Sequence, residues 1–459
     1  MVSVPSTGDR VSRWTPLIFA CALANFILAQ LLIIAGVSWP AASDASGSTL
    51  AAVHLLTIGW LTLLMFGALF QFVPVLTSER LWSHNLALGS LLLIELGLAG
   101  MVCGVWLLDT RWGLLLPAGG GAVILGILAG CLNLAIPLAQ KRPRPLSARF
   151  VIAGLVLLLL TVILGLCFAL ALTTVGPVLV VGPVVASGVE YHVLAGIGGW
   201  FTLTAIGVSY ELLPMFMLAP HDRGAWGRAV LWMAVSGFTA ALGAGVLAPA
   251  FPYVFVAGIE QAGRVIIAMA VVLYLADIAR MYRDRRRRQI ELHNRAAVGA
   301  FASLAAALAT AVIAGALNTL DRVAPALVFL LIFGWLSGLG LSQLYKIVPF
   351  LAWLARFGSR LGTGPVPRVQ DLVDERAGTY MFVAYFVSVA AASIAALLDI
   401  SWLVRAAMVA ALGATVLLSR EFWRAWQGYY VQRLAAAQTP IPIPSRTKGA
   451  GHDARATHA

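Results

Sequence analysis

Two histidines lie inside long apolar segments of the chain, and they are the residues best suited to bind a metal. His54 precedes the stretch "LLTIGWLT", and His192 precedes "VLAGIGGWFT". A neutral imidazole nitrogen is a good ligand for haem iron or copper, and two histidines from neighbouring helices can share one metal. The alternative is that both are hydrogen-bonded histidines without a ligand. His54 stands six residues before its Trp and His192 eight before its own, so the two positions are not equivalent.

The segment "GIEQAGR" carries the second set of candidates, Glu260 and Arg264, one helical turn apart inside another apolar run. This spacing permits an intrahelical ion pair, which lowers the cost of burying either charge. Such a pair can relay a proton through Glu260, line a solute path, or only stabilise the helix. Glu190 and Tyr191 can position the neighbouring His192 or bind a ligand, and wetted residues at a loop end are the alternative.

A Gly-Trp pair followed fourteen residues later by Pro occurs three times, and composition alone predicts far fewer than one such frame. The second and third frames start 140 and 135 residues after the frame before them. This spacing indicates an internal repeat. The residues that mark it are Gly59, Trp60 and Pro74, then Gly199, Trp200 and Pro214, and finally Gly334, Trp335 and Pro349.

A polar residue stands eleven positions after each of these Trp residues: Gln71, Glu211 and Lys346. On an α-helix this position falls on the same face as the Trp. Polar groups on equivalent helices are less costly when they face one another than when they face lipid. We therefore expect an ion pair between Glu211 and Lys346, bridged by Gln71. The alternative is that all three reach water at the membrane surface.

The elements that must position these residues are membrane-spanning helices. The chain is 61% hydrophobic and only 11% charged, which excludes a water-soluble globular protein of 459 residues. Apolar runs long enough to cross a bilayer recur twelve times. They cover residues 15–38, 50–77, 85–107, 112–137, 149–173, 183–218, 226–248, 252–280, 297–318, 323–355, 379–398 and 401–425.

Twelve spans with this repeat predict an all-α polytopic membrane protein made of one membrane domain, residues 1–459. Its three pseudo-symmetric four-helix repeats cover 15–137, 149–280 and 297–425 and are arranged around an approximate threefold axis. Each Gly-Trp frame lies on the second helix of its repeat. The polar tail 438–459 is expected to be disordered.

The net charge of +12 does not indicate nucleic-acid binding, because the basic residues gather in every second loop, around residues 141–149, 280–288 and 356–376. By the positive-inside rule these loops and both termini are cytoplasmic, in a bacterial-type inner membrane. The four cysteines lie in four different apolar runs and indicate neither a disulfide framework nor a zinc site.

The arrangement resembles subunit I of the haem-copper oxidases, with its three four-helix arcs and special residues on spans 2, 6 and 10. The stretches "HLLTIGWLTLLMFGALFQFVPVL" and "LSQLYKIVPFLAW" are similar to the small oxidase-subunit-I-like proteins at the edge of that superfamily, of which the NnrS proteins, linked to nitric oxide stress, are another example.

The resemblance implies a low-spin haem held by histidines of spans 2 and 10, a catalytic haem on a second histidine of span 10, and copper on one histidine of span 6 and two of span 7. Carried onto this chain, it finds His54 and His192. Spans 226–248 and 323–355 contain no histidine. A family-type centre for oxygen or nitric oxide reduction therefore cannot be assembled. What remains is a reduced haem or copper site at these two histidines, with Arg264 as a candidate anchor for a haem propionate.

Two functions follow as predictions. The first is haem or copper binding for electron transfer, gas sensing or metal handling, with membrane lipid and a redox partner or another membrane subunit as partners. The second is a proton-coupled solute or metal transporter that uses Glu211, Lys346, Glu260 and Arg264. A purely structural membrane subunit is the third alternative. A shared cavity at His54 and His192 favours the first prediction, and a continuous polar track from Glu260 to Lys346 favours the second.

Overall fold

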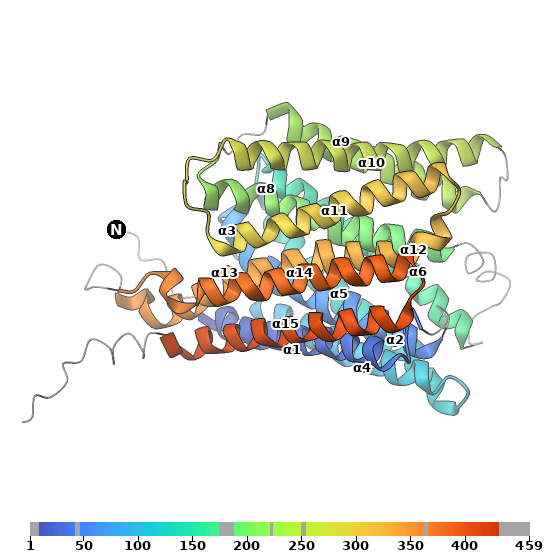
Figure 1. Ribbon diagram of the computed structural model, residues 1–459, viewed down its shortest axis with the longest axis horizontal. Helices are drawn as coiled ribbons and strands as arrows, with labels where there is room; N and C mark the ends of the chain where they lie inside the picture. Colours follow the sequence, from blue (N-terminus) through green and yellow to red (C-terminus); the bar gives the residue numbers. More distant parts are fainter. Residues whose placement is uncertain are drawn as a thin grey trace, which may run out of the picture.

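The computed structural model describes residues 9–41, 46–173, 188–220, 224–248, 254–360 and 366–430. The predicted tail 438–459 lies outside these residues. Within them every regular element is helical (Figure 1). The longer helices are α1 (Asp9–Ala35), α3 (Leu63–Thr77), α4 (His84–Trp106), α5 (Leu115–Gln140), α6 (Leu146–Leu172), α8 (Thr204–Met217), α9 (Gly224–Leu247), α10 (Val254–Arg283), α11 (Leu292–Ala316), α13 (Gly338–Phe357), α14 (Glu375–Leu397) and α15 (Ser401–Gln427).

Short elements complete the fold. They are α2 (Gly47–His54), α12 (Leu320–Val328), the π-helices η1 (Leu55–Thr62), η3 (Leu194–Leu203) and η4 (Phe329–Ser337), and the 3-10 turns η2 (Arg111–Leu114), η5 (Gly358–Arg360) and η6 (Val369–Leu372). Joined end to end, the helices of the described residues form twelve segments that are long and apolar enough to cross a membrane. The prediction of an all-helical protein with twelve spans is confirmed, and each predicted span overlaps an observed one.

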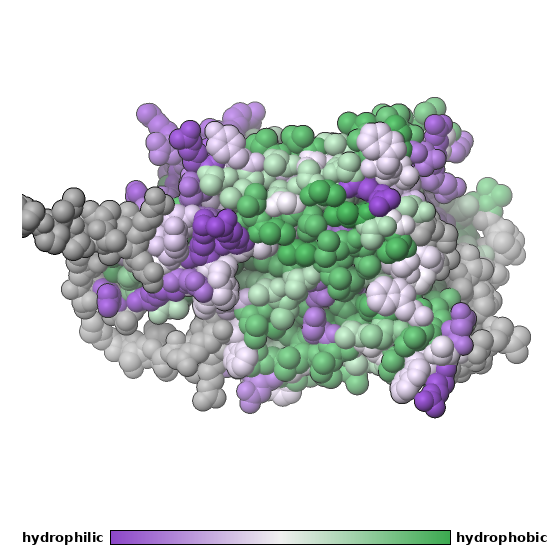
Figure 2. Space-filling view, turned by 60° about the horizontal axis from the view of Figure 1, so that its bottom comes forward, coloured by the Kyte–Doolittle hydropathy of each residue, from purple (hydrophilic) through white to green (hydrophobic). Residues whose placement is uncertain are grey.

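The directions of α1 and α15 define the two ends of the bundle. Gln30 of α1 contacts Thr415 of α15, and the Ile34 carbonyl accepts a hydrogen bond from Arg405, so the two helices run antiparallel. The start of α1 and the end of α15 therefore lie together, on the left of Figure 1. We call this the terminal end and the other the opposite end. Hydrophobic residues cover the middle of the bundle and hydrophilic residues gather at both ends (Figure 2), as expected for a membrane-spanning protein.

The neighbouring helices α4 and α5, and likewise α9 and α10, pack closely because glycines face each other between them. A Cβ on Gly97 of α4 would lie 2.7 Å from the Gly119 carbonyl oxygen of α5, and one on Gly237 of α9 would lie 2.9 Å from the Gly263 carbonyl oxygen of α10. Small residues let helices in a bilayer approach until their backbones touch. These glycines let α4 pack directly against α5 and α9 against α10.

The second helix of each repeat contains a π-helical stretch where the Gly-Trp pair lies. The Leu63 amide donates to the Ile58 carbonyl and the Gly338 amide to the Phe333 carbonyl, each five residues back. The Thr62 hydroxyl likewise donates to the Thr57 carbonyl. The apolar pattern did not predict these wider turns. η4 contacts both η1 and η3 at the centre of the bundle.

Candidate functional site

Three tryptophans close a ring at the point where η1, η3 and η4 meet. Trp60 Nε1 donates to Ser337 Oγ at 2.8 Å, Trp335 Nε1 to Thr202 Oγ1 at 3.4 Å, and Trp200 Nε1 to Thr62 Oγ1 at 3.4 Å. Each acceptor stands two residues after the Trp of another repeat. The three side chains are at most 1% exposed. We call these three residues the three-tryptophan ring. They fill the axis of the bundle.

The predicted contact among Gln71, Glu211 and Lys346 is wrong. Gln71 donates to Thr15 of α1 at 3.1 Å, and Glu211 accepts from Ser147 of α6 at 3.2 Å. Lys346 donates to Glu291, which precedes α11, at 2.5 Å. Each of the three side chains turns to the span that precedes its own in the chain, or, for Lys346, to the residue directly before that span. The prediction assumed regular α-helical geometry, and a π-helical stretch changes the angular offset between a Trp and the residues that follow it.

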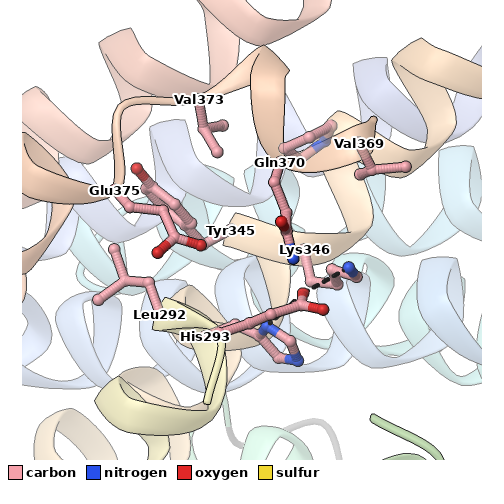
Figure 3. A pocket seen from close by; sticks show the side chains of 10 residues that line it. Leu292, His293, Tyr345, Lys346, Val369, Gln370, Val373 and Glu375 are labelled. Carbon is pink, nitrogen blue, oxygen red and sulfur yellow. Dashed lines mark hydrogen bonds and ion pairs between the residues drawn. The ribbon is translucent and has the colours of Figure 1, made fainter. Parts of the chain in front are cut away.

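Lys346 and Glu291 form the core of a charged cluster at the terminal end, beside a small pocket (Figure 3). Lys346 contacts Oε2 of Glu291, and Arg287 contacts Oε1. His293 Nδ1 lies 3.5 Å from Oε2. The Lys346 ammonium also lies 5.3 Å from the centre of the Phe216 ring, a cation–π contact. In Figure 3, His293 and Lys346 lie on one side of the pocket, and Val369, Gln370 and Val373 form its rim.

The cluster holds Glu291 as a carboxylate. Burial acts to raise the pKa of Glu291, but the hydrogen bond and charge of Lys346, with His293 and Arg287, outweigh burial and lower that pKa below its usual value. The Glu291 side chain is 7% exposed and that of Lys346 16%, so this ion pair is largely screened from water. Glu291 carries no signal in the sequence, because it lies in a polar connector 55 residues before its partner.

At the opposite end, the predicted pair of Glu260 and Arg264 is confirmed. Arg264 also binds Glu190 at 2.5 Å, so its guanidinium is shared by two carboxylates. Tyr191 lies beside Glu260 and packs against Gly245 of α9, where a Cβ would come 2.2 Å from the phenol ring. The arrangement fixes the start of the span that carries His192.

The two carboxylates of Arg264 should differ in their effect on stability. The Glu190 side chain is 58% exposed and that of Glu260 18%. We expect Glu190→Gln to lower the free energy of unfolding by less than about 1 kcal/mol, as exposed ion pairs do. Glu260→Gln should lower it more, because it removes the less exposed carboxylate and leaves Arg264 to Glu190 alone. Thermal unfolding of both variants in detergent measures the difference, and equal shifts would contradict this account.

His54 and His192 lie at the opposite end and share one feature. His54 Nδ1 lies 2.7 Å from the Leu50 carbonyl oxygen, and His192 Nδ1 lies 2.9 Å from that of Thr161. A carbonyl oxygen has no proton to donate, so Nδ1 carries the hydrogen and each neutral imidazole keeps a lone pair on Nε2. No hydrogen bond to either Nε2 is made within the described residues. His54 ends α2 and His192 lies just before η3, so each imidazole stands at the start of a π-helical stretch.

The surroundings of His192 keep its ring in place. Phe168 of α6 meets the imidazole edge to face at 5.6 Å between ring centres. Gly165 of the same helix faces the imidazole, and a Cβ there would lie 3.2 Å from its Cε1 atom. A fixed tautomer and a fixed ring orientation are what metal-binding histidines need from their neighbours. Both histidines are half-buried, and within the described residues no group of three or more His, Cys, Asp or Glu side chains could hold a metal ion.

The residues present do not fit the haem-copper centre that the resemblance implied. That centre needs a haem between spans 2 and 10. Here the contact between these spans is filled by aromatic rings: Phe26 stacks on Trp60 at 4.9 Å between ring centres and lies 5.7 Å from Phe333, while Trp39 lies 4.9 Å from Phe329. Span 10 also lacks the histidine that would hold the iron. A single metal ion at two imidazoles needs no such slot.

Glu95, a carboxyl group in the middle of α4, is a further candidate that was not predicted. Asn25 of α1 donates to both of its oxygens, at 3.0 and 3.1 Å. The signal was present, since Glu95 is the only acidic or basic residue of "HNLALGSLLLIELGLAGMVCGVW" apart from its histidine. An ionisable residue inside a span is a candidate functional residue in its own right.

Among known proteins, the likeness is to solved structures alone. No family model matches the chain, and no curated protein does. The structure is similar to that of a haem-copper terminal oxidase dimer determined by cryo-EM, with a TM-score of 0.47 and 11% sequence identity over 94% of this chain and 83% of that chain. The likeness concerns the course of the helices, and we take no residue role from it. The likeness to NnrS proteins stays a prediction.

Proposed function

We propose that this membrane protein binds one copper ion through Nε2 of His54 and Nε2 of His192, at the opposite end of the bundle, and serves in electron transfer or metal handling. The observation that supports this is the shared state of the two imidazoles, each with its Nδ1 hydrogen on a backbone carbonyl and its Nε2 lone pair available. Imidazole suits copper, iron and zinc. When bound, copper would supply a one-electron redox couple or a site for metal transfer.

Copper is favoured over haem by the packing. A haem needs a flat slot between its ligands, whereas an ion needs only two nitrogens within reach of one point. The described residues beside His192, Phe168 and Gly165, close against the imidazole. Arg264 is engaged by two carboxylates, so its predicted role as a propionate anchor would require it to leave both. The visible absorption spectrum of the purified protein tests the alternative prediction, that haem is bound.

The proposed site is tested by copper titration of the protein purified without a histidine tag. With Cu(I) buffered by a coloured chelator, we expect about one ion per chain. His54→Gln and His192→Gln should each abolish binding at that free copper concentration, because a single imidazole is left. The matched control is His84→Gln, which alters a half-buried histidine at the terminal end.

The same preparations separate the alternatives. If copper titration gave the same result in both site variants as in the wild-type protein, the copper proposal would be contradicted. A Soret band in protein from haem-replete cells, lost in His54→Gln, would replace copper by haem at the same histidine. Transport along the axis has less support, because the three-tryptophan ring fills the axis between the charged clusters of the two ends.

We also propose that the terminal end faces the cytoplasm of a bacterial cell. Four exposed arginines lie at this end: Arg283, the last residue of α10, and Arg285, Arg286 and Arg288 between α10 and α11. The positive-inside rule places such a loop in the cytoplasm. Labelling of a single cysteine introduced at Arg286 by a membrane-impermeant maleimide, before and after cell lysis, checks the orientation. A redox partner would then dock at the opposite end.

A further inference from the structure

Glu95 occupies an unusual place for a carboxyl group. It lies at the middle of α4, is half-buried, and stands between Leu92 and Leu96, which are 58% and 69% exposed. Exposed leucines in the middle of a span face lipid. The carboxyl group therefore lies at the edge of the lipid-facing surface, at the depth where water is scarce.

Asn25 is the residue that holds this carboxyl group. Its Nδ2 donates to both oxygens of Glu95 and lies 3.3 Å from the Gly59 carbonyl oxygen of η1. Gly59 allows this approach, because a Cβ there would lie 2.7 Å from Cγ of Asn25. The next residue, Trp60, stacks on Phe26 and belongs to the three-tryptophan ring. Glu95 is thus connected to the centre of the bundle through one amide group.

No cation balances Glu95 among the described residues, since none of their ion pairs includes it. The only groups described in electrostatic contact with it are Asn25 and the Cys21 thiol, one helical turn before Asn25. A lone carboxylate in hydrocarbon costs several kcal/mol. One amide donor shared with a backbone carbonyl offsets only part of that cost. A proton on the carboxyl group removes the charge altogether.

We propose that Glu95, held by Asn25, is a proton-binding site in the middle of the membrane, open to the lipid and reactive toward hydrophobic carbodiimides. The protonated carboxyl group adds its O–H across one C=N bond of the carbodiimide. Its oxygen bonds to the central carbon and its proton moves to nitrogen, which gives an O-acylisourea. The acyl group then shifts from oxygen to nitrogen and leaves a stable N-acylurea. Nothing departs, so the chain gains the whole mass of the reagent.

The test is labelling of the full chain in phosphatidylcholine vesicles with dicyclohexylcarbodiimide, followed by peptide mass spectrometry. We expect the label on Glu95, at a rate that falls as the pH rises through the range in which Glu95 loses its proton. Glu95→Gln should remove the label. The internal control is Glu375 at the terminal end, whose side chain is 39% exposed and contacts Arg295; it should react only with a water-soluble carbodiimide.

Asn25→Leu tests the role of the amide. Removal of the donor to the charged form should move the half-maximal labelling pH upward by about 1–2 units, the usual effect of a hydrogen bond to a charged group. Should this variant fail to fold, Asn25→Ser and the pH profile of the wild-type protein carry the same test. An unlabelled Glu95, a rate independent of pH, or equal reaction with the water-soluble reagent would overturn the proposal.

Discussion

Replacing Lys346 by Met should lower the free energy of unfolding by about 3 kcal/mol. Removing one partner of a buried ion pair typically costs about 3–5 kcal/mol, because the other charge is left without compensation. The effect belongs at the lower end of that range, since Glu291 keeps its contact with Arg287. Thermal unfolding in detergent measures it. Lys141→Met is the matched control, because Lys141 also lies at the terminal end and makes no ion pair within the described residues.

The double variant Lys346→Met with Glu291→Gln separates an unpaired charge from a general packing defect. Replacing both partners removes the buried charge together with its partner, so much of the lost stability should return. A double variant no more stable than Lys346→Met would show that packing around Phe216, and not the charge of Glu291, causes the loss.

The pH dependence of stability gives an independent measure of the same cluster. The pKa of Glu291 is lower in the folded protein than in the unfolded chain, where a Glu titrates near about 4.3. Its contribution is therefore complete above that pH and is lost as the pH falls through the lower, folded pKa. In Lys346→Met the main cause of the lowering is gone, so the acid-induced loss between the two pKa values should be smaller than in the wild-type protein.

The sequence predicted the parts of this structure that depend on local pattern. The span predicted at 85–107 is α4, His84–Trp106, because an apolar run of this length forms a helix in a bilayer even with one carboxyl group, Glu95, in its middle. The Glu260–Arg264 pair was predictable because both residues lie one turn apart on the same helix. The three Gly-Trp frames indicated where three equivalent helices would meet.

Features that depend on tertiary packing were beyond the sequence. The partner of Lys346 lies 55 residues away in a connector, and no periodicity marks it. A uniformly apolar run cannot distinguish bonds to the fourth residue back from bonds to the fifth, so the π-helical stretches stayed hidden. The Nδ1 bonds of His54 and His192 are also invisible in a sequence, and they are what support a metal site there.

The second large effect on stability is expected at the three-tryptophan ring of Trp60, Trp200 and Trp335. Replacing any one of them by Ala should lower the free energy of unfolding by about 3–5 kcal/mol, since a buried Trp leaves a large cavity between helices that cannot collapse onto it. All three side chains are fully buried at one axis, so the three losses should be similar. Thermal unfolding of the three single variants in the same detergent tests this.

The Trp→Phe variants isolate the hydrogen bonds of the ring from its packing. Phe keeps most of the aromatic volume and removes only Nε1–H, and interhelical hydrogen bonds in membranes contribute on average about 0.6 kcal/mol. Trp60→Phe should cost the most of the three, because its bond to Ser337 is 2.8 Å long whereas the other two are 3.4 Å. Large losses in all three Phe variants would mean that the ring acts as one cooperative network. Losses in Ala variants no larger than those in Phe variants would mean that neighbouring side chains such as Phe26 and Phe333 refill the axis.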